Sequence, residues 1–123
     1  MMMQITDAPC AWLTTVRPDG SPHTTPVWFV LRDDTFFIAS AATNVKVRNI
    51  VADDRVSIAI DGSATDPHVA QGRARIRREI GELPDVVSLF AQKYNDWNVL
   101  DEAADGPRVM IETPVDRWLL GGS

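Results

Sequence analysis

The sequence predicts a mainly β protein in which an antiparallel sheet of six to seven short strands closes into a barrel, accompanied by two helices. Three observations predict this class. Short segments rich in β-branched and aromatic residues recur along the chain. Turn residues such as those of "RPDGS" (17–21) separate them closely, as in hairpins. Helical spacing of apolar residues occurs in only two places, too few for a doubly wound parallel sheet.

Length and composition suit one globular domain over residues 1–123, with 45% hydrophobic and 24% charged residues. The formal net charge of −5 disfavours general binding to nucleic acid or to a membrane surface. Cys10 is the one cysteine, so we expect neither an internal disulfide nor a bound metal. The chain shows no signal-peptide pattern and no run of about 20 apolar residues, so we expect a cytoplasmic protein.

The first elements follow from extended, apolar segments between turns. Strands are expected over 10–16, 22–31 and 35–40. Pro26 predicts an edge position or a bulge, because proline cannot donate a hydrogen bond to a ladder. A short amphipathic helix is expected over 43–52, where apolar residues take helical spacing at Val47, Ile50 and Val51, and where Thr43 or Asn44 serves as the N-cap.

The second half of the chain again alternates strands with turns and contains one larger helix. A strand over 55–60 and a loop over 61–67 precede a long strand over 68–80, in which Gly72 indicates a bulge or a close approach. A helix is expected over 84–95, with Pro84 in its first turn. After the loop 95–106, two short strands are expected over 108–113 and 116–121, separated by Pro114.

Common catalytic motifs are missing from the sequence. His23 and His68 lie in neither a hydrolase nor a zinc-binding context, and His68 is most simply a residue at a loop–strand junction. Neither G-x-G-x-x-G nor a P-loop occurs, so a nucleotide would have to be bound in another way. Hydrolase, zinc, Rossmann and triphosphatase functions are therefore disfavoured.

The stretch "AATNVKVRNI" (41–50) gathers Lys46 and Arg48 in an acidic protein. The first turn of a helix offers free N–H groups and the positive end of the helix dipole. Together with a lysine, and with an arginine whose fork suits phosphate, it makes an anion site. The simpler interpretation, in which both cations lie on a solvated helix face, stays open.

Two further patterns suit a flat, anionic ligand. Arg73, Arg75 and Arg77 alternate along an expected strand and so share one face, either as an ordinary outer face or as a cationic track. Trp28, within "TPVWF" (25–29), suits a heteroaromatic ring equally as well as a core position. The remaining tryptophans are better explained as core or subunit-interface residues, namely Trp12, Trp97 and Trp118.

These features in this order resemble the split β-barrel family related to pyridoxamine 5′-phosphate oxidase. "TTVRPDGSPHTTPVWFV" is similar to the opening hairpin of that family. "FFIASAATNVKVRNIVADDRVSIAI" resembles its strand, phosphate-binding helix start and next strand, and "VAQGRARI" its later long strand. The pattern K-V-R-N followed by D-x-R-V is most similar to actinobacterial members that use the deazaflavin coenzyme F420, whereas other members bind FMN.

The resemblance implies an FMN-binding-type split barrel that forms a homodimer with cofactor sites at the subunit interface. Lys46 would bind the cofactor phosphate, and Val27 and Trp28 would lie beside the ring. The full set of implied cofactor-binding residues is Pro26, Val27, Trp28, Ser40, Ala41, Asn44, Val45, Lys46 and Arg48. Many relatives carry an arginine where this chain has Asn44. The chain lacks the C-terminal Trp/Arg segment of the true oxidase, so oxidation of pyridoxamine phosphate is not expected.

The expected activity is that of an F420H2-dependent oxidoreductase that transfers a hydride to a small unsaturated organic substrate. No residue is assigned to catalysis, because hydride transfer from a bound donor requires no protein nucleophile. Arg73, Arg75 and Arg77 could favour F420, whose tail carries carboxylates that FMN lacks. The alternatives are an FMN-binding oxidoreductase of the same fold and a non-catalytic flavin- or tetrapyrrole-binding protein.

Overall fold

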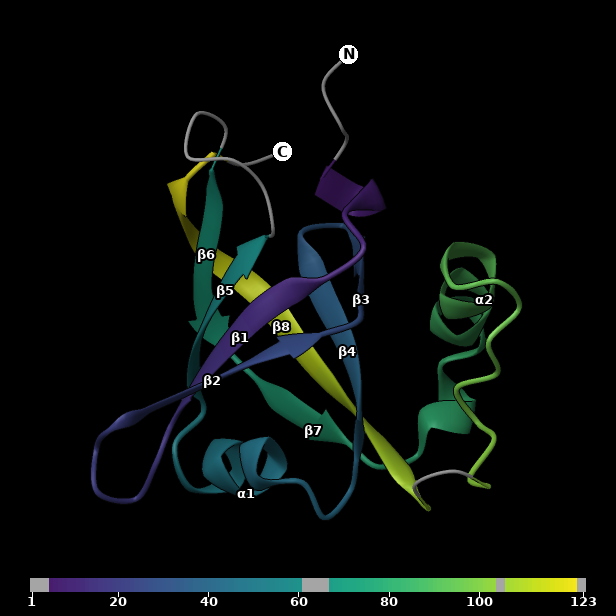
Figure 1. Cartoon of the computed structure of the whole chain (residues 1–123), viewed down its shortest axis with the longest axis horizontal. Coiled ribbons are helices and arrows are strands. Elements are labelled where there is room, and N and C mark those ends of the chain that lie inside the picture. Colours follow the sequence, from purple (N-terminus) through teal and green to yellow (C-terminus); the bar gives the residue numbers. More distant parts are fainter. Residues whose placement is uncertain (1–4, 61–66, 104–105, 122–123) are drawn as a thin grey trace.

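The computed structural model describes residues 5–60, 67–103 and 106–121. Its antiparallel strands follow the order β2-β1-β5-β6-β8-β4-β3, and β7 pairs with β8 beside this path (Figure 1). The strands are β1 (Ala11–Val16), β2 (Pro22–Val27), β3 (Phe29–Arg32), β4 (Thr35–Ala41), β5 (Arg55–Ile60), β6 (His68–Arg73), β7 (Arg75–Arg77) and β8 (Arg108–Leu120). The mainly β, antiparallel fold class is confirmed.

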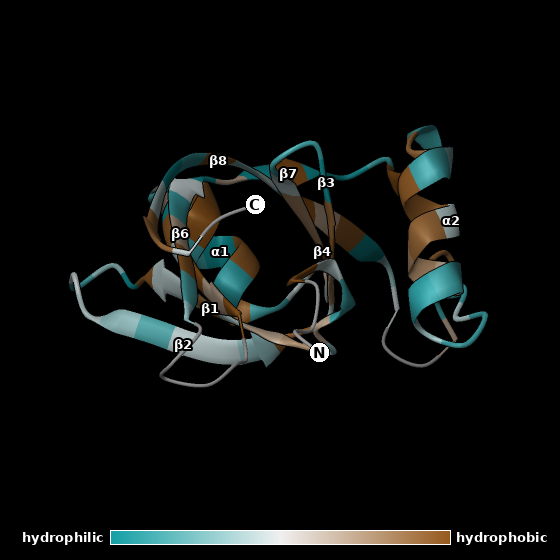
Figure 2. Ribbon diagram, turned by 90° about the horizontal axis from the view of Figure 1, so that it is seen from above, coloured by the Kyte–Doolittle hydropathy of each residue, from teal (hydrophilic) through white to brown (hydrophobic). Residues whose placement is uncertain are grey.

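Two α-helices cover different parts of the sheet. Helix α1 (Val45–Ala52) follows β4 and packs against β1 and β7 at one end of the curled sheet (Figure 1). Helix α2 (Pro84–Lys93) packs against β3 and forms a separate layer beside the sheet (Figure 2). Short 3₁₀ helices cover Ile5–Asp7 and Ile80–Glu82. No helix in these described ranges is long and apolar enough to cross a membrane.

The sheet is forced to curl because its two end strands are neighbours in the chain. Strands β2 and β3 stand at opposite ends of the strand order, yet only Trp28 separates them. The Cα atoms on either side of one residue are at most about 7 Å apart, so the ends of the sheet must come together. The inner face holds the main core, whose largest fully buried side chains include Leu13, Phe29, Phe36, Ile38 and Ile111.

A second apolar cluster lies between α2 and the sheet. It contains Val30, Phe37, Val86, Phe90 and Met110, all of them buried. Helix α2 therefore contributes a core of its own rather than extending the core inside the barrel. This explains its amphipathic spacing and its position beside β3 and β4 (Figure 2).

The single strand predicted over 22–31 is wrong. The chain is interrupted at Trp28, because β2 pairs with β1 whereas β3 pairs with β4. The edge position predicted from Pro26 is confirmed, since β2 ends the strand order and Pro26 lies opposite Trp12. The helix predicted over 43–52 begins at Val45 with Asn44 as its N-cap, and the helix predicted over 84–95 ends at Lys93.

The long strand predicted over 68–80 is also wrong. It breaks at Ala74, whose N–H donates to the carbonyl of Asp54 (2.8 Å) instead of to a neighbouring strand. The close approach predicted at Gly72 is confirmed, because a Cβ there would lie 2.4 Å from the carbonyl oxygen of Pro114. The register between β6 and β8 also shifts beside Gly72. Most of the predicted loop 61–67 lies outside the described residues.

The two C-terminal strands predicted around Pro114 form one strand, β8. Pro114 needs no N–H partner, and the next residue, Val115, donates to the carbonyl of Asp34 (2.8 Å). At this position β8 leaves its partner β4 and continues beside β6. A proline is tolerated where a strand exchanges one neighbour for another, because the ladder is already interrupted there.

The end of α2 is attached to the edge strand β3 by polar contacts. The ammonium group of Lys93 donates to the carbonyl of Phe29 (2.8 Å) and lies 3.5 Å from the centroid of the Phe29 ring. Burial of this group lowers the pKa of Lys93 to about 8. The contact holds α2 on β3, although it leaves a cation in a partly buried position.

Gly72→Ala should destabilise the fold, because the new methyl group would meet the backbone oxygen of Pro114, which cannot rotate away. We expect a loss of about 1–3 kcal/mol in the free energy of unfolding, measured by denaturant titration. Gly81→Ala is the matched control, since no atom lies within 4 Å of its Cβ position. Equal stability of the two variants would refute the close approach.

Lys93→Met should change how stability depends on pH. The folded-state pKa of Lys93 is about 8 and its usual value is 10.5, so the unfolded chain binds more protons within this window. Wild-type stability should therefore rise with pH across the window, relative to that of Lys93→Met. Guanidinium titrations at about pH 7.5 and about pH 9.5 measure the difference. If wild type and Lys93→Met differ in stability by the same amount at both pH values, the lowered pKa of Lys93 is contradicted.

Candidate functional site

Six of the nine predicted site residues lie where β4 turns into α1, whereas Pro26, Val27 and Trp28 lie at the junction of β2 and β3. Strand β4 ends at Ala41, which lies opposite Arg108 of β8. The turn is fixed by two backbone bonds, from the N–H of Ala42 to Pro107 (2.9 Å) and from the N–H of Asn44 to Ala41 (3.1 Å). The Ser40 side chain is buried, and its hydroxyl donates to the carbonyl of Ala41 (3.1 Å). This junction therefore presents the start of α1 in a defined orientation.

Lys46 lies in the first turn of α1 and is buried, with only 9% of its surface exposed. Within the described ranges, its ammonium group makes no recorded ion pair or hydrogen bond. Burial lowers the pKa of Lys46, because removal of water disfavours the charged form. A cation that is partly removed from water without a counter-ion is unfavourable, and an anionic ligand would relieve that cost.

The backbone at the start of α1 adds to this positive site. The carbonyl of Asn44 accepts from the N–H groups of Val47 (3.1 Å) and Arg48 (3.3 Å), while the Asn44 side chain makes no capping bond. Among the described contacts, the N–H groups of Val45 and Lys46 have no recorded acceptor. Free N–H groups at a helix N-terminus favour negative charge.

Arg48 does not join Lys46. Residues two positions apart on an α-helix point about 200° apart. Arg48 is exposed and lines a pocket of about 320 Å³ together with Arg17, Pro18, Val45 and Asn49, whereas Lys46 does not line it. The structure therefore separates the two cations that the sequence places side by side.

Trp28 stands at the junction of β2 and β3 and is 48% exposed. Its ring stacks on Tyr94 with a centroid distance of 4.3 Å and an interplanar angle of 3°, and it meets Trp97 edge-on at 5.2 Å. The preceding residues differ in exposure, since Val27 is buried and Pro26 is exposed. Trp28 is therefore not a core residue. Its ring is held in one orientation by two aromatic neighbours and still exposes part of its surface.

Tyr94 fixes the orientation of Trp28, and sequence reasoning did not identify it as a site residue. Its hydroxyl accepts from the N–H of Phe29 (3.0 Å), and the carbonyl oxygens of Pro9 (3.0 Å) and Phe29 (3.1 Å) lie within reach as acceptors. Burial raises the pKa of Tyr94, so the hydroxyl keeps its proton at neutral pH. The helical spacing that leads up to Tyr94 indicates that its ring faces the sheet, but not what the ring contacts.

The described part of the loop after α2 is attached near the same junction. Arg108 donates to the carbonyl oxygens of Val99 (3.1 Å) and Asp101, and its guanidinium carbon lies 5.1 Å from the centroid of Trp97. Because Arg108 pairs with Ala41, these contacts bring the loop to the end of β4. The loop thus lies beside the end of β4, and its Trp97 also contacts Trp28.

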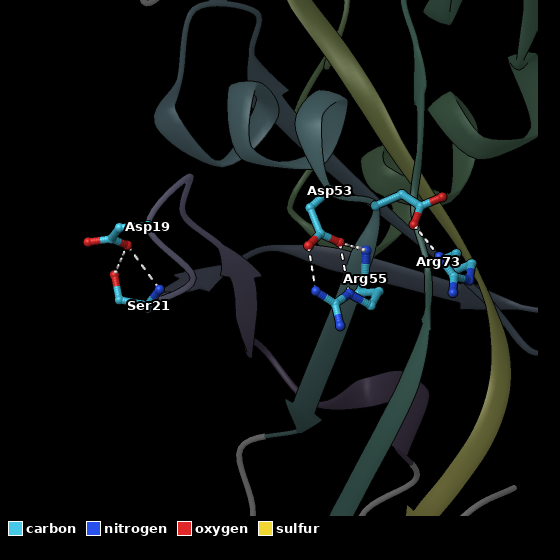
Figure 3. Close-up of polar contacts among 6 residues, drawn as sticks. Asp19, Ser21, Asp53, Arg55 and Arg73 are labelled. Carbon is cyan, nitrogen blue, oxygen red and sulfur yellow. Dashed lines mark hydrogen bonds and ion pairs between the residues drawn. The ribbon is translucent and has the colours of Figure 1, made fainter.

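The arginines of the predicted cationic track have carboxylate partners. Arg73 contacts Asp54 at 2.7 Å (Figure 3). Arg77 and Arg75 lie 3.1 Å and 4.0 Å from Glu112. The track is also divided between β6 and β7. Its positive charge is largely compensated within the protein, so it is poorly suited to attract a distant anion.

The histidines show no catalytic arrangement within the described ranges. His68 begins β6, and Gly121 lies so close that a Cβ there would be 2.3 Å from the His68 Nδ1 atom. His23 lies in β2, and its buried Nδ1 has no hydrogen-bond partner. In the same ranges no group of three His, Cys, Asp or Glu residues is placed to hold a metal ion.

Comparisons with known proteins agree with this fold. A family model described as pyridoxamine 5′-phosphate oxidase matches residues 2–120. The F420H(2)-dependent biliverdin reductase of Mycobacterium tuberculosis (strain CDC 1551 / Oshkosh) is 30% identical over 111 residues, which cover 89% of this chain and 77% of that protein.

Solved structures show the same architecture. An F420 reductase superposes with a TM-score of 0.75 at 21% identity, covering 93% of this chain and 92% of that chain. A conserved hypothetical protein from Mycobacterium tuberculosis superposes with a TM-score of 0.74 at 26% identity, covering 96% and 83% of the two chains. The predicted split β-barrel is confirmed, and the chain belongs to the pyridoxamine 5′-phosphate oxidase family.

Proposed function

We propose that this protein is an F420H2-dependent reductase that transfers a hydride to a small unsaturated organic substrate. The observation that carries the proposal is the largely buried side chain of Lys46, whose ammonium group has no recorded counter-ion in the described structure. Membership of the family and the 30% identity to an F420H(2)-dependent enzyme support the deazaflavin as the ligand.

The residues present fit such a cofactor. Lys46 and the free N–H groups of Val45 and Lys46 offer charge and donors to a phosphate group. The accessible surface of Trp28 suits a planar ring, whose orientation Tyr94 would secure through Trp28. The remaining contacts would come from Pro26, Val27, Ser40, Ala41 and Asn44, which flank these two positions along the chain.

Bound F420H2 would supply a hydride, as an obligate two-electron donor. The work of the protein is then to bind, to orient and to exclude water. Lys46 binds the anionic part, Trp28 orients the ring, and the loop after α2 shields one side. No protein nucleophile is required, and the chain has no residue arranged as one in the described site.

A second copy of the chain would complete the site. An apolar row crosses the outer face of the sheet, because Trp12 lies opposite Ala59, Ala59 opposite Val69, and Val69 opposite Leu120. Trp12 is 43% and Leu120 51% exposed. Such a row is suited to burial against an identical surface around a two-fold axis. We therefore include homodimerisation in the proposed function.

Light scattering should give a mass of about twice the 13.6 kDa of one chain. Trp12→Lys should shift the protein towards the monomer, because it places a charge in the apolar row. Arg78→Lys is the control, since Arg78 is exposed and lies outside that row. A monomeric wild-type protein would remove dimerisation from the proposal without affecting the Lys46 site.

Titration of the purified protein with F420 and with FMN, followed by Trp fluorescence, tests the choice of cofactor. We expect F420 to bind and to quench Trp28 more strongly than FMN does. Tight binding of FMN alone would favour the FMN-dependent alternative. Binding of F420 without turnover of activated enones, quinones or bilins would favour a non-catalytic binding protein.

Lys46→Met should weaken F420 binding by about 10- to 100-fold, because it removes a charge-assisted contact to phosphate. Its free energy of unfolding should stay equal or rise, because an apolar side chain of similar length replaces a buried cation. Arg78→Met removes the same charge from an exposed position and serves as the control. Equal affinities for F420 in both variants would refute the role of Lys46.

A further inference from the structure

A pocket of about 320 Å³ lies between the β1–β2 turn and α1. Its lining contains two arginines, Arg17 and Arg48, one from each of these elements. Pro18 and Val45 provide apolar surface, and Asn49 completes the lining. Two cations in one concavity of an acidic protein are the feature that the proposed function does not yet use.

These two arginines differ from most of the others in having no ion pair recorded in the described structure. Ion pairs hold Arg32, Arg55, Arg73, Arg75 and Arg77. Figure 3 shows two of these ion pairs. Arg55 lies 2.6 Å from Asp53, and Arg73 pairs with the carboxylate of Asp54. The Arg55 guanidinium lowers the pKa of Asp53 to about 2.

No ion pair or side-chain hydrogen bond is recorded for Arg17 or Arg48 in the described structure. Arg78 and Arg117 share this property but lie apart from each other, after β7 and in β8. Arg17 and Arg48 are therefore distinguished by lining the same pocket. Like charges held together repel each other, and an anion between them removes that repulsion.

The backbone holds Arg17 in place. Its N–H donates to the carbonyl of Ser21 (2.9 Å), and its carbonyl accepts from the N–H of Gly20 (2.8 Å). Asp19 is the carboxylate of the same turn, but it accepts from the Ser21 N–H (2.9 Å) and hydroxyl (2.6 Å), as Figure 3 shows. These bonds, with a smaller contribution from Arg17, lower the pKa of Asp19.

Helix α1 is attached to the same strand that leads into Arg17. The Asn49 amide donates to the Thr15 hydroxyl (3.0 Å), and both residues are buried. Arg48 therefore lies on a helix that is attached to β1. The point of attachment, Thr15, is two residues before Arg17 in the sequence. Because both backbones are fixed, the ordering cost of an anion falls mainly on the two side chains.

We propose that the pocket of Arg17 and Arg48 is an anion-binding site, separate from Lys46, that takes the carboxylate or phosphate groups of a flexible chain. Arginine suits both groups, since its planar fork donates two parallel hydrogen bonds. The pocket begins on the same first turn of α1 that carries Lys46. If the proposed function holds, the anion is the carboxylate tail of the bound cofactor; otherwise it is a free polycarboxylate.

The test compares Arg17→Gln/Arg48→Gln with Arg73→Gln/Arg75→Gln, which removes the same charge from ion-paired positions outside the pocket. Each protein is titrated with F420, with a deazaflavin that lacks the phosphate and tail, and with citrate followed by amide chemical shifts. We expect the first pair to lose about tenfold in affinity for F420, with a shallower salt dependence, and to keep its affinity for the tail-free ring.

The arms separate the two sources of the anion. A loss confined to F420 assigns the pocket to the cofactor tail. If wild-type protein does not bind F420, the proposed function fails, yet citrate shifts at Arg17 and Arg48 that the pocket variant abolishes would still establish the site. Unchanged binding of both F420 and citrate, or an equal loss in the Arg73/Arg75 variant, would overturn it.

Discussion

The short connection between β2 and β3 is the constraint on which the rest of the structure depends. One residue, Trp28, joins strands that stand at opposite ends of the sheet order. The sheet must therefore curl until its ends meet, and its inner side chains must fill the barrel. The same constraint places Trp28 at the line where the ends meet, neither inside the core nor free on a loop. A side chain at such a position becomes a defined surface only if something holds it, and Tyr94 of the α2 segment does so.

The start of α1 shows a second principle, in which a residue that lowers the stability of the fold is kept at a proposed binding position. The fold buries most of the Lys46 side chain and partly removes its ammonium group from water, without a recorded ion pair in the described ranges. Elsewhere the protein compensates its cations, as at Arg55, Arg73 and Arg77. Lys46 and Arg48, on the first turns of one helix, have no recorded ion pair in the described ranges, within a protein that is acidic overall.

Local patterns predicted most elements, because turn chemistry and periodicity act over a few residues. Strand β5 has the predicted ends, and α1 begins within two residues of its predicted start. The predictions are wrong where a contact with a residue distant in the sequence determines the local structure. Ala74 leaves its strand for Asp54, and Pro114 is accommodated because β8 changes neighbours there. The site follows the same rule. Lys46 was recognisable from its charge, whereas Tyr94 and Arg17 gain their roles from contacts that sequence spacing does not contain.

The two ends of the strand order have a consequence for the behaviour of the protein in concentrated solution. A sheet that ends in free strands exposes backbone groups to which another chain can add a strand. Here β2 carries Pro22 and Pro26, which have no N–H to offer. On β3, the backbone of Phe29 is already engaged by Lys93 and Tyr94. Each end is thus blocked by a different device, which disfavours the addition of a strand from another chain and so fibrous aggregation.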